Sequence, residues 1–509
     1  MHNLELEKKF ARISLHLSFR PQANKEAILR SLKSEDPRKT THKEVRKEKL
    51  VGITLKITHE EEGKMQFEKK YRVALGMALS FVIVLCGTAF AAQKVVHVWH
   101  TETNPLSRTA VANIVARFEA LHPDIKVEAE ALAWGDLEGK IMAGLAAGSP
   151  PEVSHGQPVT CAALQAKGLL LPLDELVDHI GEENIWDQIK KVGKFGDHYY
   201  GLVHAAGTSL LIYRKDLAKE KGIVEGPKTW EDFLDIAEAL TTDDMYGLTI
   251  PGDNLFINIL TGELTKANGG ILFDDQNRPQ FTDKSMMEIL DLLKKLTKYM
   301  PPGWEGHGYL ETFANMYGQK AAMMYQGYGR GASLIEQYAP EHMANTDYFD
   351  VWIKPHGPGG TKPAAQVDEE PWMLFKGSRN PQEAIEFLKF FYEDDNYLEY
   401  IQTVPIHFFP VTKSLRRNKD YLDTPMIKKW KGWLDVQEYY LENDLVKPTM
   451  VIDWKDLAQK PYLMEILGSG ILKDMVMEVT KEDVALEKAT ARAQKRAEEL
   501  LERGGYAKW

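Results

Sequence analysis

The sequence predicts an α/β protein with largely parallel sheets, folded as two large lobes. One observation is that strand-like and helix-like segments alternate along the chain, which favours parallel strands joined by crossover helices. The other is length, because the region 92–509 is too long for a single hydrophobic core. In such folds ligands bind outside the carboxyl ends of the strands.

The alternation begins with KVVHVWH (94–100), whose β-branched and aromatic residues favour a strand. Residues 107–123 place apolar side chains at helical spacing and end at a proline, and 125–132 alternate like a second strand. The segment 134–177 then predicts a helix, a proline turn, a short strand and a further helix. Near the end of the chain, 481–503 predicts a charged, amphipathic surface helix.

A segment typical of an export signal lies far from the first methionine. Three basic residues (Lys69, Lys70, Arg72) precede an apolar run, and the small-x-small pattern at 89–91 predicts cleavage before Ala92. Translation from Met65 would give a signal of ordinary length. We therefore predict that 65–91 is a signal peptide, and that 1–64 is a disordered, non-native extension from an over-extended gene start.

The charge distribution supports this boundary. Residues 1–64 carry 15 Lys and Arg against 10 Asp and Glu, whereas the whole chain has a net charge of −11. The shift in composition indicates that two unlike segments are joined here. Cleavage would release the protein into the periplasm. The alternative is a membrane anchor, because residues 73–92 number about twenty, enough to span a bilayer as a helix.

Composition and motifs exclude several classes of protein. Cys161 would be the only cysteine after cleavage, so no intramolecular disulfide is expected. An acidic exported chain argues against nucleic acid as a partner. The sequence lacks H-E-x-x-H, paired C-x-x-C, Walker and G-x-S-x-G motifs, and HGPGGTK (356–362) has the spacing of a turn. No cofactor and no metal site are predicted.

Two kinds of side chain remain as candidates for chemistry. Asp368, Glu369 and Glu370 lie beside Trp372, and a retaining glycosidase needs only two carboxylates about 5 Å apart, so an enzyme stays possible. Aromatic residues also gather at strand ends and in loops, namely Trp99, Trp134, Trp304, Tyr328, Trp372, His407, Phe408 and Phe409. Sugar rings stack on such side chains, although each could instead fill a core.

Four stretches carry a resemblance to a known family: 143–155, 199–241, 313–330 and 376–391. They include AGLAAGSPPEVSH, the turn PKTWEDF, and FANMYGQKAAMMYQGYGR. In their residue types and in their order along the chain, these stretches resemble the extracellular (periplasmic) solute-binding proteins of sugar-type ABC importers, family 1. The matches are spread over the whole region that follows the signal.

The resemblance implies a two-lobe binding-protein fold, each lobe a mostly parallel sheet flanked by helices, joined by a multi-segment hinge. The N-terminal lobe would comprise 92–204 and 355–420, and the C-terminal lobe 205–354 and 421–509. Such a protein is a monomer and not an enzyme. It captures a sugar or polyol between its lobes and delivers it to ABC importer permease subunits in the inner membrane. The alternative is a secreted glycoside hydrolase or lyase with a carboxylate pair.

The same resemblance places ligand contacts after the first strand, after the strand in SPPEV, and after the strand that ends at GYGR. Arg330 departs from the family pattern and favours an anionic or phosphorylated ligand. QVDEEPW replaces a glycine-rich run, so that Asp368 or Glu369 can bind hydroxyls in place of Trp372. The predicted ligand-binding residues are His100, Thr101, Glu102, Trp134, His155, Gln157, Thr208, Trp304, Tyr328, Arg330, Asp368, Glu369, Trp372, His407 and Phe408.

The signal predicts a defined amino terminus. If translation starts at Met65 and cleavage follows Ala91, amino-terminal sequencing of exported protein should begin at Ala92. Detection of residues 1–64 in the exported protein would contradict this, and retention of the full chain in the membrane fraction would favour the anchor.

Overall fold

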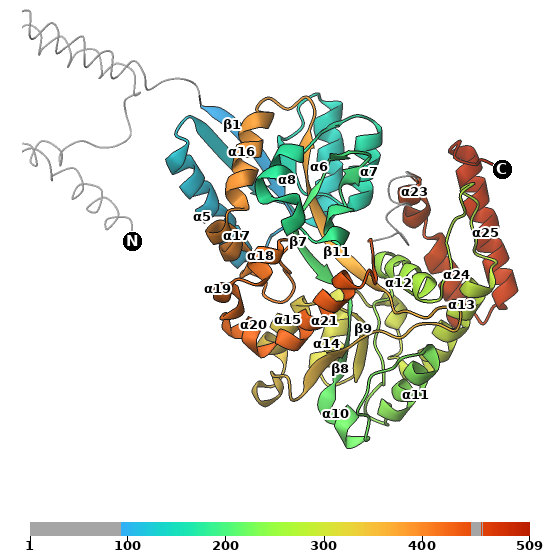
Figure 1. Ribbon diagram of the computed structural model, residues 1–509. Helices are drawn as coiled ribbons and strands as arrows, with labels where there is room; N and C mark the ends of the chain where they lie inside the picture. The colour runs from blue at the N-terminus through green and yellow to red at the C-terminus, as the bar shows by residue number, and fades with distance from the viewer. Residues whose placement is uncertain (1–92, 449–459, 461) are drawn as a thin grey trace, which may run out of the picture. The chain divides into compact units, whose positions relative to one another are not determined.

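A computed structural model describes residues 93–448, 460 and 462–509 (Figure 1). The predictions for 1–64, for the signal peptide 65–91 and for the anchor 73–92 concern residues outside this part. Within it, no helix is both long and apolar enough to cross a bilayer. Phe90–Trp509 forms one compact unit.

Within the described residues, strands from all parts of this unit form three sheets. They are β1 (Lys94–His100), β2 (Ile125–Ala131), β3 (Val153–Ser154), β4 (Leu170–Leu171), β5 (Lys194–Phe195), β6 (His198–Tyr199), β7 (Leu202–Thr208), β8 (Leu210–Arg214), β9 (Met323–Gly327), β10 (Phe349–Trp352), β11 (Ala365–Phe375) and β12 (Val446–Lys447).

Helices connect and cover these sheets. The α-helices are α5 (Pro105–Leu121), α6 (Trp134–Ala146), α7 (Pro158–Ala166), α8 (Asp174–Ile180), α9 (Asp187–Lys190), α10 (Lys215–Glu220), α11 (Trp230–Leu240), α12 (Asn254–Ala267), α13 (Lys284–Leu296), α14 (Tyr309–Tyr317), α15 (Arg330–Tyr338), α16 (Pro381–Phe391), α17 (Asp394–Ile401), α18 (Lys413–Arg416), α19 (Lys419–Leu422), α20 (Pro425–Lys429), α21 (Lys431–Glu442), α23 (Leu463–Gly468), α24 (Ile471–Thr480) and α25 (Leu486–Arg503).

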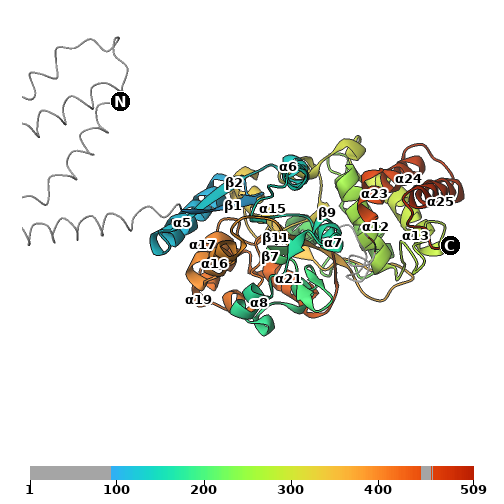
Figure 2. The same cartoon turned by 90° about the horizontal axis from the view of Figure 1, so that it is seen from above.

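The segment predictions agree with these elements. The predicted strands at 94–100 and 125–132 are β1 and β2, and the helix predicted between them is α5. The amphipathic helix predicted at 481–503 is α25, which packs against α13 and α24 through residues such as Ala493 and Leu501 (Figure 2). Alternation in the sequence therefore predicted the local structure correctly.

The largest sheet has the order β12-β11-β3-β1-β2, with β4 and β7 also paired to β11. β1 runs parallel to β2 and β3, as the crossover helices require. β11 runs antiparallel to β3, β4 and β7. The direction of β11 follows from connectivity, because β7 leads the chain into the second sheet and β11 brings it back.

The second sheet has the order β10-β8-β9, and both of its strand pairs are antiparallel. The sequence predicted a mostly parallel sheet in each lobe, so this part of the prediction is wrong for β8, β9 and β10. The physical reason is again connectivity. β8 continues from β7 as the chain enters this sheet, and β10 lies on the path that returns to β11, so the two strands run in opposite directions.

A buried ion pair lies where the chain passes between the two sheets. Lys354, in the segment after β10, places Nζ 2.9 Å from both carboxylate oxygens of Glu263 on α12, and both side chains are fully buried. Ser209, between β7 and β8, donates to Glu263 and accepts from Lys354 Nζ at 2.6 Å. The backbone N–H of Gln366 on β11 donates to the same carboxylate at 2.6 Å. One helix, two connecting segments and strand β11 therefore meet at a single charge pair.

Breaking this pair should be costly. Lys354→Met leaves a buried carboxylate without its cation, so we expect the free energy of unfolding in denaturant to fall by about 3–5 kcal/mol. Replacing both residues by apolar ones should recover much of this loss, because no charge then remains buried. Lys228→Met, which removes the exposed pair with Glu225, is the matched control and should change little. An unchanged unfolding curve for Lys354→Met would contradict the assignment.

Candidate ligand-binding site

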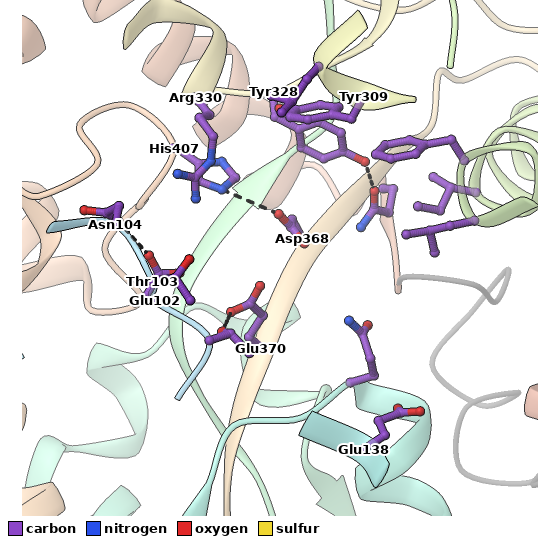
Figure 3. A pocket seen from close by; sticks show the side chains of 17 residues that line it. Glu102, Thr103, Asn104, Glu138, Tyr309, Tyr328, Arg330, Asp368, Glu370 and His407 are labelled. Carbon is purple, nitrogen blue, oxygen red and sulfur yellow. Dashed lines mark hydrogen bonds and ion pairs between the residues drawn. The ribbon is translucent and has the colours of Figure 1, made fainter. Parts of the chain in front are cut away.

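A cavity of about 650 Å³ opens between the elements of the two sheets (Figure 3). Its lining comes from the loops after β1, before α7 and after β9, from α6, α12, α14, α15 and β11, and from the loop before α18. It lies at the carboxyl ends of β1, β3 and β9, where an α/β fold is expected to bind ligands. The lining residues are Thr101, Glu102, Thr103, Asn104, Glu138, Gln157, Leu255, Phe256, Ile259, Tyr309, Leu310, Tyr328, Arg330, Gln366, Asp368, Glu370 and His407.

Strand β11 supplies three of these side chains by its alternation. Gln366, Asp368 and Glu370 occupy every second position and face the cavity. Glu369 points to the opposite face of the strand and is 1% exposed. Asp368 and Glu370 are thus the carboxylates that β11 offers to a ligand.

Glu370 is held by a chain of hydrogen bonds. Its Oε2 accepts from Thr101 Oγ1 at 3.1 Å and lies 2.9 Å from His204 Nε2. The other nitrogen of His204, Nδ1, lies 2.8 Å from the hydroxyl of Tyr400. With the hydroxyl of Tyr400 donating to Nδ1, a neutral His204 can donate from Nε2 to Glu370. The side chain of Glu370 is therefore fixed in one orientation toward the cavity.

Burial sets the protonation of these groups. It raises the pKa of Glu370 from 4.5 to about 7, while the hydrogen bond from Thr101 and the nearby Arg330 act to lower it. Burial and the charge of Glu370 raise the pKa of Asp368 from 3.8 to about 7, although Arg330 again opposes the shift. Burial also lowers the pKa of His204 to about 4, so this ring is neutral at pH 7.

The opposite wall of the cavity is aromatic. Tyr309, the first residue of α14, stacks on Phe256 of α12 with ring centroids 5.3 Å apart and planes 5° apart. Tyr328 packs edge-on against Tyr309 at 5.7 Å and donates its hydroxyl to Gln366. The hydroxyl of Tyr309 is buried and has no hydrogen-bond partner within the described part of the chain. Flat apolar faces thus lie opposite acidic side chains.

Arg330 begins helix α15 and points into the cavity beside His407 (Figure 3). His407 Nε2 lies 3.8 Å from Asp368 Oδ2, and burial followed by the charge of Arg330 lowers the pKa of His407. Gly329 lets the His407 loop come this close, because a Cβ at this position would lie 2.2 Å from the carbonyl oxygen of Ile406. The GYGR motif therefore combines a ring, a close backbone contact and a cation.

Three side chains, Glu370 in the cavity lining and two buried histidines beside it, are close enough to one another to hold a metal ion. His155, His204 and Glu370 each bring one potential ligand atom within 4.8 Å of the others. The rings of His155 and His204 are stacked, however, with centroids 4.0 Å apart and planes 8° apart. Ring nitrogen lone pairs lie in the ring plane, so stacked parallel rings cannot direct both at one ion. The arrangement fits a hydrogen-bonded support for Glu370 better than a metal site.

The structure brings seven of the fifteen predicted residues together in the cavity lining: Thr101, Glu102, Gln157, Tyr328, Arg330, Asp368 and His407. Seven others are buried outside the lining: His100, His155, Thr208, Trp304, Glu369, Trp372 and Phe408. Trp134 begins α6, but its side chain lies outside the described part of the structure. Whether the seven lining residues bind a ligand remains a prediction.

The predicted aromatic residues outside the lining fill cores instead. Trp372 is 2% exposed and packs against the ring of His155 at 3.8 Å. Phe408 stacks on Tyr400 at 5.2 Å, next to the His204 support. Trp304 is 3% exposed and belongs to a hydrophobic core cluster that also contains Ile257 and Met300. The sequence showed where these rings lie along the chain, but a ring in a loop can turn toward either the ligand or the core.

Sequence reasoning missed ten lining residues: Thr103, Asn104, Glu138, Leu255, Phe256, Ile259, Tyr309, Leu310, Gln366 and Glu370. Two of them could have been found, because strand alternation from Asp368 selects Gln366 and Glu370 rather than Glu369. The residues of α12 and α14 carried no such signal, since only the folding of α12 and α14 beside β11 brings them to the cavity.

The fold and the cavity define a two-lobe solute-binding protein. Residues 113–429, more than half of the chain, match the family described as bacterial extracellular solute-binding protein, and the chain belongs to this family. The maltotriose-binding protein of Pyrococcus abyssi (strain GE5 / Orsay) is 22% identical over 67% of this chain and 71% of its own length. The resemblance found in the sequence is thereby confirmed.

Solved structures show the same fold. A solute-binding protein of an ABC transporter from Agrobacterium radiobacter K84, in complex with ribitol, aligns with a TM-score of 0.64 at 21% identity, over 80% of this chain and 98% of its own. Maltose-bound T. maritima MalE3 aligns with a TM-score of 0.64 at 17% identity, over 80% of this chain and 100% of its own. The predicted two-lobe α/β class is confirmed.

The raised pKa of Asp368 predicts a pH-dependent effect on stability. The folded protein keeps this proton up to about pH 7, whereas the unfolded chain loses it near 3.8, so the wild type loses stability as pH rises between these values. Asp368→Asn cannot lose a proton there. In denaturant unfolding the variant should match the wild type near pH 4 and exceed it at pH 8. An equal difference at both pH values would show that this carboxyl does not titrate as described.

Proposed function

We propose that the protein is a periplasmic substrate-binding protein that captures a sugar or polyol and delivers it to the permease subunits of an ABC importer. The observation that carries the proposal is the cavity itself, in which an aromatic wall faces carboxylates and an arginine. Sugar rings present apolar C–H faces to aromatic side chains, and their hydroxyls bind charged and polar groups. The buried hydroxyl of Tyr309, which lines the cavity and has no partner within the described residues, is a further hydrogen-bonding group for such a ligand.

The lining also supports closure of two lobes on the ligand. Glu102, Glu138 and Glu370 belong to elements of the first sheet, whereas Tyr309 and Arg330 belong to helices around the second. A ligand that contacts both groups favours the closed state. We propose lobes of 92–204 with 355–420 and of 205–354 with 421–509, and a monomer as the working form.

A secreted glycoside hydrolase or lyase was the alternative. Asp368 and Glu370 are two carboxylates on one strand face, yet they serve equally well as acceptors for ligand hydroxyls. Members of the family are transport binding proteins, and none of the comparisons supports a hydrolase. We therefore propose that this protein binds its ligand without turnover.

The experiment is a thermal-shift screen of the purified protein against mono- and oligosaccharides, polyols and their phosphates. A binding protein should be stabilised by at least one sugar or polyol, because a ligand that binds only the folded state raises its stability. Product analysis after overnight incubation tests for turnover. Product formation would support the enzyme, and the absence of stabilisation by any member would contradict the proposal.

Two aromatic substitutions should have opposite effects. Tyr309→Ala removes a ring face that the ligand would cover, so affinity for the sugar found in the screen should fall about tenfold, roughly 1.4 kcal/mol. Trp372→Ala empties a core position and should lower the free energy of unfolding by about 3–5 kcal/mol. Ligand titration and denaturant unfolding are measured for both variants. If Tyr309→Ala binds as the wild type does, the aromatic wall is not the stacking surface.

A further inference from the structure

The cavity carries an excess of negative charge. Glu102, Asp368 and Glu370 lie close to one another: burial, and after it the charge of Glu370, raises the pKa of both other carboxyls. Glu138 lies at the far end of the same lining (Figure 3). Arg330 is the only lysine or arginine among the lining residues. Four carboxyl groups, two of them partly protonated at pH 7, therefore surround one permanent cation.

No protein cation neutralises these carboxylates directly. Within the described residues, no lysine or arginine forms an ion pair within 4.0 Å of Glu102, Glu138, Asp368 or Glu370. Glu102 accepts from Asn104 Nδ2 at 3.1 Å, and Glu138 accepts from Thr160 Oγ1 at 2.6 Å. The nearby histidines are held neutral by burial. These carboxyl groups thus have neutral hydrogen-bond donors and no direct ion pair with a lysine or arginine, although the charge of Arg330 lies near enough to act on Glu102, Asp368 and Glu370.

Buried carboxylates without a cation are costly, and Glu102 is only 5% exposed. Resting on the proposed function, we infer that the ligand carries its own positive charge: it is an amino sugar or an amino polyol with a protonated amine. An ammonium group has three donors, which can be shared among Glu102, Asp368 and Glu370. The positive charge that pairs with these carboxylates would then come from the ligand and not from a protein side chain.

The rest of the cavity fits the same ligand. The amine lies toward the carboxylates, and the sugar ring lies against Tyr309 and Phe256 on the opposite wall. Arg330 binds ring hydroxyls, and its charge favours the ionised form of the neighbouring carboxyls Asp368 and Glu370. This assignment replaces the expectation of an anionic or phosphorylated ligand, because a phosphate would meet four carboxylates for each guanidinium.

Binding of a cation should also release protons. At pH 7 Asp368 and Glu370 are partly protonated, and a bound ammonium lowers their pKa. Of the groups that face them, the histidines stay neutral and Arg330 stays charged, so the protons come from the carboxyls. The facing groups are Thr101 and Glu102 after β1, His100 on β1, His155 after β3, His204 on β7, Tyr309 on α14, Arg330 on α15, and His407 before α18.

The test is calorimetric titration of the purified protein with matched pairs: glucose against glucosamine, sorbitol against its 1-amino derivative, and cello-oligosaccharides against chitosan oligosaccharides. N-Acetylglucosamine, glucosamine without its charge, is the matched control ligand. At least one amine should bind tenfold or more tightly than its neutral partner, with an affinity that falls as salt rises. Titration in two buffers of different ionisation enthalpy should show proton release for the amine only.

Variants locate the effect. Glu370→Gln and Asp368→Asn should weaken binding of the amine at least tenfold more than binding of its neutral partner, and Glu225→Gln, at an exposed site, should leave the ratio of the two affinities unchanged. Neutral sugars that bind as tightly as their amines would overturn the inference and leave the proposed function standing. If neither member of any pair binds, the inference and the proposed function both fail. A preference that survives in both cavity variants would also overturn it.

Discussion

The ion pair between Lys354 and Glu263 is the constraint on which the two-sheet arrangement depends. Two fully buried charges persist only when each is compensated, and their partners come from the segments that pass between the sheets. The ring of Tyr325 on β9 adds a cation–π contact, with Lys354 Nζ 4.5 Å from its centroid. The segments before β8, after β10 and at the start of β11 must therefore meet at one place.

Strand β11 links this junction to the ligand cavity. The backbone of Gln366 binds Glu263, and its side chain accepts the hydroxyl of Tyr328 in the cavity wall. Two and four residues further on, Asp368 and Glu370 present their carboxyls to the same cavity. A movement of the two sheets relative to each other would thus change the positions of these two carboxyl groups. The charge-pair junction and the ligand cavity therefore share one strand.

The site also shows how rigidity and charge are balanced. Glu370 is oriented by Thr101 and by the Tyr400–His204 chain, all of them neutral donors. Neutral donors fix a side chain without cancelling its charge, which leaves the carboxylate available to a ligand. A cation in place of His204 would pair with Glu370 and cancel the charge that a cationic ligand would use. Burying a carboxylate without a paired cation is unfavourable, and this is seen in the raised pKa of Asp368 and Glu370.

The sequence alone determined the class of fold, the alternation of elements, the family, and seven of the seventeen residues that line the cavity. These follow from local periodicity and from motifs such as SPPEV and GYGR, which are written in consecutive residues. It did not determine the direction of β8, β9 and β10, the choice of Glu370 over Glu369, or the turning of Trp372 into the core. Those features depend on contacts between residues far apart in the chain. Only the tertiary structure brings α12 and α14 to β11, and thereby decides which side chains face the ligand.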